Sequence, residues 1–591
     1  MTPIERLRRT LLRLLGLCFV AITLVVAFRY PIYKLLQIPS SATYLTTLFG
    51  LLVLHLGLSS VKTASSTGNS PPKVKGWLPG NVDILWKLVQ GERSEYCAAT
   101  LRDWEQRYGP TYDMNILWGH QIVTSDPVNV KEILATNFSQ FEKSRRLRDM
   151  LVNFLGDGIF TSDGDEWKNH RAIARPFFSR ERVTDYEIFE KNTQRLIRRL
   201  LSESGAATSL NIQELYSQFT IDSIAEFLLG IELNTLDGKW STTTNETGPF
   251  VKAFEELQSI SMTRIRIGTN WPIFELFGDR SEKPAKVLNE YIEPIVEMSM
   301  RPEGRESENT RGTYLQYLVE TVNNPKIVRD AVVSLLLAGR DTTASLLSFV
   351  TYCLAIHPEK ATIIREEINS ILSVSGRPPT AEDIKQMRYL RAFINETLRL
   401  FPPLPMNIRR ANQDTTLTSP LSNHGPFFIK KNVSVTIASI MTQRSKAIWG
   451  EDAEEFKPER WLVSPNIAPS QQQADSPGIE SEDSTPNAYL KNLTHVSNPY
   501  AFTPFNAGPR ICLGQSFALS ECAYTIIRLL QTFESFELDE AKQPLPIVDL
   551  VAAAPGSRFE REASEKCWPR ASLTLYIEGG LWIKLRPNQP V

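Results

Sequence analysis

The sequence predicts a mainly helical protein, and three segments support this fold class. Residues 327–356 are apolar almost throughout and precede Pro358, so we expect a long helix that is hydrophobic on most faces and buried in a large core. The apolar stretch 390–400 ends at Phe401-Pro402-Pro403, where proline is incompatible with a continuing helix. After Gly514, apolar residues recur at helical spacing as far as Phe533, which predicts a third helix.

The net charge and the cysteine spacing exclude some classes of protein. The chain of 591 residues has a net charge of −1, whereas a nucleic-acid partner normally requires a concentrated basic face. Its six cysteines lack paired spacing, which in a chain of this length is typical of a reducing compartment. We find no internal repeat and no Gly/Ser-rich linker after Gly80. Nucleic acid is therefore not an expected partner, and a disulfide framework is not an expected source of stability.

Two apolar stretches, 14–28 and 45–61, precede the globular part of the chain. Both are close to the short limit for a membrane-spanning helix, for which about 20 apolar residues are usual. Four arginines lie before the first stretch and would hold the N-terminus in the cytosol. Two spans would return the following domain to the cytosol, and one span with an interfacial helix is the alternative. A cleaved signal peptide is disfavoured because no A-x-A-like site follows Phe28.

These features divide the chain into three predicted parts. Residues 1–62 are expected to form a membrane anchor of one or two transmembrane helices. Residues 63–80 are expected to form a proline-rich hinge that stiffens the connection to the bilayer, with an ordinary linker as the alternative. Residues 81–591 form one large domain. Within it, residues 462–498 are rich in Ser, Pro, Gln, Asp and Glu and poor in aromatic residues, which predicts a disordered surface insertion.

The most informative motif surrounds Cys512, in the run Phe505-Asn-Ala-Gly-Pro-Arg510-Ile-Cys512-Leu-Gly514. Glycines before and after the cysteine predict a tight loop that presents one sulfur atom while backbone N–H groups gather round it. A buried thiolate requires such a place, because the anion is tolerated only when it binds a metal and accepts hydrogen bonds. An axial thiolate on haem iron favours O–O bond cleavage. A structural turn with a buried thiol is the alternative, and is the commoner fate of a single cysteine.

Four further motifs accompany the cysteine loop: Trp167-Lys-Asn-His-Arg171, Ala338-Gly-Arg-Asp341-Thr342-Thr343, Glu396-Thr-Leu-Arg399 and Phe456-Lys-Pro-Glu-Arg460-Trp461. In this order the five motifs resemble those of the cytochrome P450 monooxygenase family, over roughly residues 70–590. The resemblance implies a cytochrome P450 fold, mainly α with a small β region, preceded by N-terminal membrane helices. It also implies a haem b cofactor whose iron is axially ligated by Cys512.

The long helix 327–356 carries Gly339, Asp341 and Thr342 near its centre. A glycine costs about 1 kcal/mol relative to alanine in a helix interior, and a buried carboxylate costs more unless it is paired. A core helix that tolerates both is more often functional than structural. The resemblance implies that Gly339 lets the helix approach the haem and leaves room for dioxygen. It implies that Thr342 hydrogen-bonds the bound oxygen and that Asp341 supplies protons from solvent.

Other motif residues are assigned by the resemblance to support of the haem. Glu396, Arg399 and Arg460 would form a buried charged triad that braces the cysteine loop. A haem carries two propionates, and arginine matches a carboxylate in a bidentate way. The implied contacts with the haem are Trp167, Arg171, Arg409, Phe505, Arg510 and Gly514, with Arg410 as the alternative to Arg409.

His170 is the histidine closest in sequence to an implied haem contact, because it precedes Arg171. We interpret it as a packing residue or as support for the propionate side, not as an iron ligand. No CxxC or HExxH pattern suggests another metal site.

Substrate contacts in the family come from several separated segments, which correspond here to residues 147–160, 334–338, 402–407 and 547–553. These segments are mostly apolar, so the resemblance implies an apolar pocket. The run Gly156-Asp-Gly-Ile-Phe160, together with the motif around Asp341, is similar to the fungal branch that hydroxylates alkanes and fatty acids. A terpenoid or another lipid-like secondary metabolite would suit the same pocket.

The resemblance thus implies a membrane-bound monooxygenase of the endoplasmic reticulum, facing the cytosol, that inserts one oxygen atom of O2 into an apolar substrate. The chain has no dinucleotide or flavin fingerprint, so NADPH electrons would come from a separate NADPH–cytochrome P450 reductase, with cytochrome b5 as a further candidate donor. A reductase-independent haem-thiolate isomerase or dehydratase would not need the Asp341–Thr342 pair. A non-catalytic haem-binding protein would leave both that pair and the apolar pocket unexplained.

Overall fold

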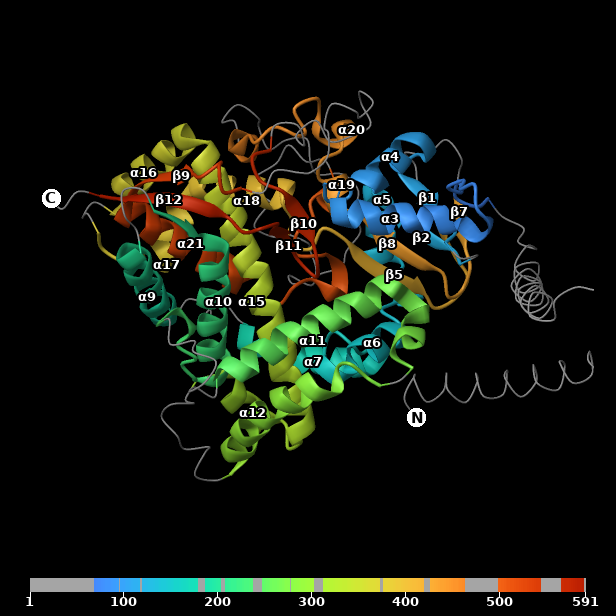
Figure 1. The fold of residues 1–591 in the computed structure, drawn as a ribbon, viewed down its shortest axis with the longest axis horizontal. Helices are drawn as coiled ribbons and strands as arrows, with labels where there is room; N and C mark the ends of the chain where they lie inside the picture. The colour runs from blue at the N-terminus through green and yellow to red at the C-terminus, as the bar shows by residue number, and fades with distance from the viewer. Residues whose placement is uncertain are drawn as a thin grey trace, which may run out of the picture.

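The protein is described by a computed structural model, which covers residues 69–94, 96–116, 119–178, 186–203, 208–237, 247–276, 278–301, 312–372, 376–418, 426–462, 498–543 and 565–588. Helices dominate these residues (Figure 1). They are α3 (Val82–Ser94), α4 (Ala99–Tyr108), α5 (Pro127–Lys131), α6 (Arg145–Leu155), α7 (Gly164–Ala174), α9 (Glu187–Glu203), α10 (Ile212–Leu229), α11 (Thr247–Ile267), α12 (Glu282–Met300), α14 (Tyr314–Thr321), α15 (Pro325–Ile356), α16 (Pro358–Leu372), α17 (Ala381–Gln386), α18 (Arg388–Leu400), α19 (Ser439–Thr442), α20 (Lys446–Trp449) and α21 (Gln515–Thr532).

Short strands form the β region. They are β1 (Thr111–Asp113), β2 (Gln121–Thr124), β3 (Phe141–Glu142), β4 (Ser209–Asn211), β5 (Asn407–Ala411), β6 (Thr415–Leu417), β7 (Phe427–Ile429), β8 (Ser434–Ile437), β9 (Phe533–Leu538), β10 (Pro569–Ala571), β11 (Leu575–Ile577) and β12 (Trp582–Pro587). A five-stranded sheet has the order β1-β2-β8-β5-β3, with β2 and β8 parallel. A three-stranded sheet has the order β4-β12-β9. The prediction of a mainly helical fold with a small β region is confirmed.

Figure 1 shows the two larger sheets at opposite ends of the molecule, with α15 running between them. The five-stranded sheet lies with α3, α4 and α5 at one end, and β9 and β12 lie near α16 and α21 at the other. Because α15 passes through the middle, residues at its centre can contribute to a site assembled from both halves of the chain.

The predicted central helix begins at Pro325 and ends at Ile356. Its N-terminus is capped by the Asn324 side chain, which accepts hydrogen bonds from the backbone N–H groups of Lys326 and Ile327. Among the described residues it is the one helix long and apolar enough to cross a membrane, but 72% of its apolar window is buried inside the protein. It is therefore the core helix that its hydrophobic faces predict.

Gly339 allows α10 to pack closely against α15. A Cβ atom at this position would lie 2.5 Å from Cγ1 of Ile224, which is too close for any real side-chain contact. The structure thus gives the glycine a packing role between two helices, in addition to the haem approach expected from the motif. Helix α18 ends before Phe401 and α21 begins after Gly514, both as predicted.

Part of the predicted proline-rich hinge, residues 69–80, is described. The backbone N–H of Val74 donates to the carbonyl of Asp113, and the N–H of Asp113 donates to the carbonyl of Pro72, at 2.9 and 2.8 Å. Residues 72–74 are therefore bonded to β1, whose edge satisfies their backbone groups. The predicted membrane anchor 1–62 and the main part of the predicted insertion 462–498 lie outside the described residues.

Candidate active site

The cysteine loop is closed by short-range hydrogen bonds. The backbone N–H of Cys512 donates to the carbonyl of Phe505 at 2.9 Å, and the N–H of Ile511 donates to Gly508 at 3.0 Å. The Asn506 side chain donates to the carbonyl of Arg510 at 3.0 Å, while its own backbone adopts a positive φ of 64°. These bonds make the tight loop that the glycine spacing predicts, and they hold the cysteine at its tip.

Gly508 allows the loop to lie against the short helix Glu132–Thr136. Its φ of +65° is in the left-handed region, and an added Cβ would overlap the backbone carbonyl of Leu134. Only glycine satisfies both conditions, because it has no Cβ. Gly514 is less constrained, since a Cβ there would make ordinary contacts of 3.9 Å with Phe178 and 4.0 Å with the Cys512 sulfur.

The Cys512 side chain has exposed surface, unlike the other four described cysteines, which are buried. Surrounding protein nevertheless raises the pKa of its thiol by burial, while a hydrogen bond from the backbone N–H of Gly514 and the charge of Arg171 lower it. A sulfur that faces an interior space would have both exposed surface and a pKa raised by the protein around it. The N-terminus of α21 follows directly, and its positive end favours an anion at this sulfur.

The propionate contact of Arg171 stays a prediction, and the structure gives this residue a partner in the cysteine loop. Its guanidinium donates to the carbonyl of Ile511 at 2.8 Å and lies near Cys512. The spacing from Trp167 explains the placement, because four residues along α7 bring Arg171 one turn further, to the cysteine loop. The Trp167 ring lies between two guanidinium groups, 4.4 Å from that of Arg510 and 6.0 Å from that of Arg171.

Arg409 and Arg510 have N–H groups without protein partners. Arg409 is 1% exposed and donates through Nη1 to Asn407 and Ile408, but its Nε and Nη2 have no acceptor among the described residues. Arg510 donates through Nη2 to Asp163 at 2.7 Å, and its Nη1 has no acceptor there. In β5, Arg410 is only partly buried, so the choice of Arg409 over Arg410 agrees with the burial pattern of the strand.

Lys143 joins these two arginines, and sequence reasoning missed it. Burial and then the charges of Arg409 and Arg510 lower the pKa of Lys143 to about 7. Burial and Arg510 likewise lower the pKa of Arg409 to about 9. Asp163 is the carboxylate nearest all three in these electrostatic interactions, so the cluster lacks negative charge. Lys143 lies in the short connection between β3 and α6, in an unremarkable sequence context, and only the fold brings it here.

These observations fit a haem with its propionates. A porphyrin that carries two carboxylates would supply acceptors for the unpartnered N–H groups of Arg409 and Arg510 and the negative charge that the cluster lacks. Cys512 would supply the single protein ligand of the iron. Among the described residues no group of three His, Cys, Asp or Glu side chains could hold a different metal ion.

On α15, Asp341 and Thr342 are neighbours, as predicted. The Thr342 hydroxyl donates to the carbonyl of Ala338 at 2.7 Å. Burial raises the pKa of Asp341, although Arg340 and a hydrogen bond from Gln258 lower it, and its Oδ2 atom has no partner among the described residues. A carboxyl with a raised pKa keeps its proton to a higher pH than a solvated carboxyl does, which suits a proton donor.

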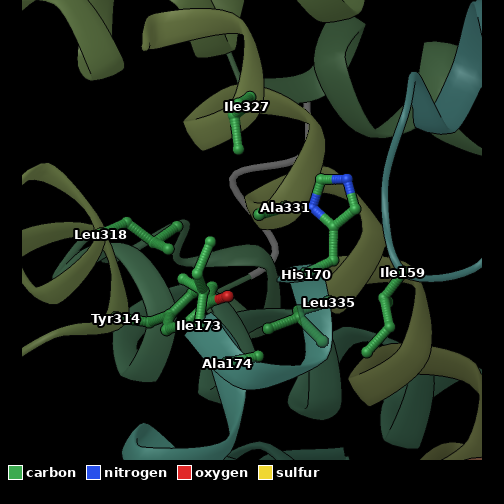
Figure 2. Close-up of a pocket in the computed structure, with 9 residues that line it drawn as sticks. All are labelled: Ile159, His170, Ile173, Ala174, Tyr314, Leu318, Ile327, Ala331 and Leu335. Carbon is green, nitrogen blue, oxygen red and sulfur yellow. The ribbon is translucent and has the colours of Figure 1, made fainter. Parts of the chain in front are cut away.

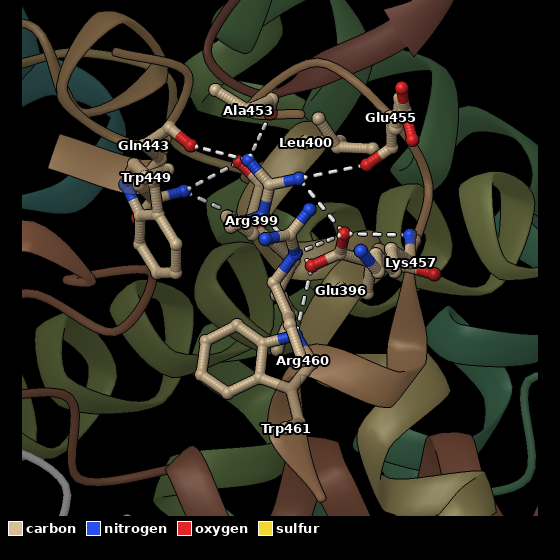
Figure 3. Close-up of polar contacts among 12 residues, drawn as sticks. Glu396, Arg399, Leu400, Gln443, Trp449, Ala453, Glu455, Lys457, Arg460 and Trp461 are labelled. Atoms are coloured by element: carbon tan, nitrogen blue, oxygen red, sulfur yellow. Dashed lines mark hydrogen bonds and ion pairs between the residues drawn. The ribbon is translucent and has the colours of Figure 1, made fainter. Parts of the chain in front are cut away.

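The predicted charged triad is present, with Glu396 and Arg399 fully buried and Arg460 largely buried (Figure 3). Arg399 donates to Glu396 through Nε and Nη2, each at 2.8 Å, and Arg460 donates through Nε at 2.9 Å. The backbone N–H of Lys457 and the indole N–H of Trp461 also donate to Glu396, at 2.8 and 2.9 Å. Glu396 therefore accepts five hydrogen bonds, and its charge is compensated by two guanidinium groups.

Gln443 connects this triad to the cysteine loop, and no sequence motif indicated it. Its carbonyl accepts a hydrogen bond from Arg399, and its side chain donates to the carbonyls of Leu398 and Arg399. Its side-chain oxygen accepts from the backbone N–H of Thr503, at 3.1 Å, two residues before Phe505. The triad is thus connected to the segment before the cysteine loop through one buried residue, Gln443.

His170 lies in a small apolar pocket between α7, α14 and α15 (Figure 2). Burial lowers the pKa of its imidazole, and its surroundings include Ile173, Leu318 and Ala331. This placement agrees with a packing role and not with iron ligation. Two predicted substrate segments each contribute one residue to this pocket, Ile159 and Leu335, while the segment 547–553 lies outside the described residues.

Comparison with known proteins agrees with the site. The family model for cytochrome P450 matches residues 78–558. Cytochrome P450 52E1 of Candida apicola is 33% identical over 492 residues, covering 80% of this chain and 87% of that protein. Cytochrome P450 52A1 of Candida tropicalis is 36% identical over 443 residues, covering 73% and 75%. Cytochrome P450 monooxygenase himC of Aspergillus japonicus is 32% identical over 474 residues, covering 79% and 77%. The chain therefore belongs to the cytochrome P450 family, and is a haem-thiolate monooxygenase.

Proposed function

We propose that this monooxygenase hydroxylates a long-chain apolar lipid, with a fatty acid or an alkane favoured over a terpenoid or another secondary metabolite. Members of the family use dioxygen, a redox partner and a lipophilic substrate. The observation that carries the proposal is the buried Asp341 carboxyl, with an unpartnered oxygen next to Thr342 on the central helix. Apolar residues in the segments 334–338 and 402–407 support a lipid substrate.

Each site residue has a role that follows from its position around the haem site. Cys512 would ligate the iron, while Arg409, Arg510 and Lys143 would bind the propionates. The bound haem supplies the site at which dioxygen is reduced and one of its atoms is transferred to a C–H bond. Thr342 and Asp341 would hold and move the protons that the second oxygen atom needs to leave as water. Phe505, beside the cysteine, would keep water from the thiolate.

Electrons would come from NADPH through a separate NADPH–cytochrome P450 reductase, with cytochrome b5 as an additional donor. Support for this proposal is the absence of a dinucleotide or flavin motif from the sequence. Residues 1–62 would anchor the protein in the endoplasmic reticulum, and residues 81–591 would face the cytosol as one catalytic domain. The arginines before residue 14 support this orientation.

The test is turnover of the purified holoenzyme, in lipid vesicles, with the reductase, NADPH and a panel of alkanes, fatty acids and terpenoids. Hydroxylated product that depends on the reductase supports the proposal. The best substrate in the panel shows which class of lipid the pocket binds. Product formation without the reductase would favour an isomerase or dehydratase instead. A reduced carbon monoxide complex without the red-shifted Soret band of thiolate ligation would refute the assignment of Cys512.

A further inference from the structure

The side chain that precedes Asp341 is shared between two carboxylates. Arg340 donates through Nη2 to Glu255 of α11 at 2.5 Å, and its Nη1 lies 3.5 Å from Oδ1 of Asp341. The Arg340 side chain is 8% exposed and that of Asp341 is 12% exposed, whereas that of Glu255 is 52% exposed. The three groups form a row that begins at the surface and ends at the proposed proton donor. Figure 1 shows α11 crossing α15, which allows this contact.

One guanidinium cannot neutralise two carboxylates. If both acids were ionised, the row would carry a net charge of −1 in a largely buried place, where an uncompensated charge is costly. Binding one proton removes that charge. The proton belongs on the inner acid, because burial raises the pKa of Asp341 whereas Glu255 is solvated.

Arg340 decides how strongly Asp341 holds this proton. After burial, the charge of Arg340 is the largest influence on the pKa of Asp341, and it lowers it. A hydrogen bond from Gln258 of α11 also lowers it, and the negative charge of Glu255 raises it. After burial, Arg340, Gln258 and Glu255 are thus the main influences on the pKa of Asp341. Arg340 lies closer to Glu255 than to Asp341, at 2.5 Å against 3.5 Å. Its positive charge therefore interacts more strongly with the outer carboxylate than with the inner one.

We propose that Glu255 is a positioning residue for Asp341: it draws Arg340 toward the surface and so keeps the inner carboxyl in its proton-carrying form. This inference rests on the proposed function, in which Asp341 donates the proton. When Asp341 gives that proton toward Thr342, it becomes a carboxylate. Arg340 can then pair with it until solvent returns a proton. Glu255 and Arg340 thus act through Asp341 and do not touch the substrate.

The decisive variant is Glu255→Gln, which removes the outer charge with little change in shape. Arg340, which already lies 3.5 Å from Asp341, would then share its charge with Asp341 alone, and this lowers the pKa of Asp341. A fall of one unit in this pKa reduces the protonated fraction about tenfold at a pH above the pKa. Glu256→Gln is the matched control, because Glu256 is the next residue on α11 and is exposed.

Two readouts separate the inference from the proposed function. The first is the infrared carbonyl band of the protonated Asp341 carboxyl, assigned by its loss in Asp341→Asn and titrated against pH in the holoenzyme. The second is coupling, measured as product formed per NADPH consumed, over the same pH range. We expect Glu255→Gln to move both midpoints toward acid pH, with Glu256→Gln unchanged and Glu255→Asp partly restored.

An infrared midpoint that is the same in Glu255→Gln and wild type would overturn the inference, whatever the activity. A moved infrared midpoint with an unmoved coupling profile would also overturn it, since Glu255 would then not act on turnover. If the wild-type enzyme formed no product with any lipid, the proposed function would fail, while the infrared titration would still test the control of Asp341 by Glu255.

Discussion

Replacing Glu396 by glutamine tests the charged triad most directly. Glu396→Gln keeps the shape of the side chain but removes its charge, and the new amide N–H₂ faces donors of Arg399 or Arg460. Glu396 and Arg399 have no exposed surface, and Arg460 is largely buried, so water cannot replace the lost acceptor. Breaking a buried ion pair by removing one partner typically costs about 3–5 kcal/mol.

The measurement is urea-induced unfolding, followed by the Soret absorbance of the bound haem, at neutral pH. We expect Glu396→Gln to lose about 3–5 kcal/mol of stability and to release haem at a lower urea concentration. Glu382→Gln is the matched control, because Glu382 pairs with Lys385 at the same three-residue spacing on an exposed surface. Such exposed pairs contribute about 0–1 kcal/mol.

The direction of the pKa shift of Glu396 determines how its contribution to stability depends on pH. Burial alone would raise the pKa of Glu396, but Arg399, Arg460 and the backbone N–H of Lys457 lower it below its ordinary value. The stabilisation is therefore complete above the unfolded-state pKa of about 4.3 and is lost as the pH falls through the folded-state pKa. The difference between wild type and Glu396→Gln should shrink over that acidic range. A loss below 1 kcal/mol at neutral pH, or equal losses in both variants, would refute the buried-triad reasoning.

Three further predictions concern the haem site. Thr342→Ala should keep the carbon monoxide spectrum but form less product per NADPH and more hydrogen peroxide, and unchanged coupling would contradict the proton role. Gly508→Ala should lose haem, because its Cβ would overlap the Leu134 carbonyl, whereas Gly164→Ala has the same positive φ without any close contact and should retain it. Lys143→Met should speed transfer of haem to apomyoglobin, and an unchanged transfer rate would exclude Lys143 from the propionate site.

Sequence reasoning succeeded where a local pattern reflects a local structure. The helix at Pro325–Ile356 follows from its continuous apolar character and ends where Pro358 follows. The cysteine loop follows from its glycines, because a left-handed residue and a close backbone approach both require the absence of a Cβ. Arg409 is buried in β5 and Arg410 is only partly buried, a difference that follows from the alternation of side chains along a strand.

Contacts between residues far apart in the chain could not be predicted from local sequence patterns. Arg171 bonds through Nη1 to Ile511, 340 residues away, a contact that the motif did not indicate. Lys143 reaches the arginine cluster and Gln443 reaches Thr503 from segments without any recognisable motif. Gly339 is required by Ile224 on another helix, a contact that no spacing along the chain reveals.

By itself the sequence determined the chemistry available to this protein: one cysteine in a tight loop, an acid–hydroxyl pair in an apolar helix, and the charged residues that accompany them. Those features depend on neighbouring residues, whose spacing sets turns and helix faces directly. Only the tertiary structure decided which charges share a partner, as Arg340 does between Glu255 and Asp341. Charge and hydrogen-bond energies depend on distance and burial in three dimensions, and residues far apart in the chain set both.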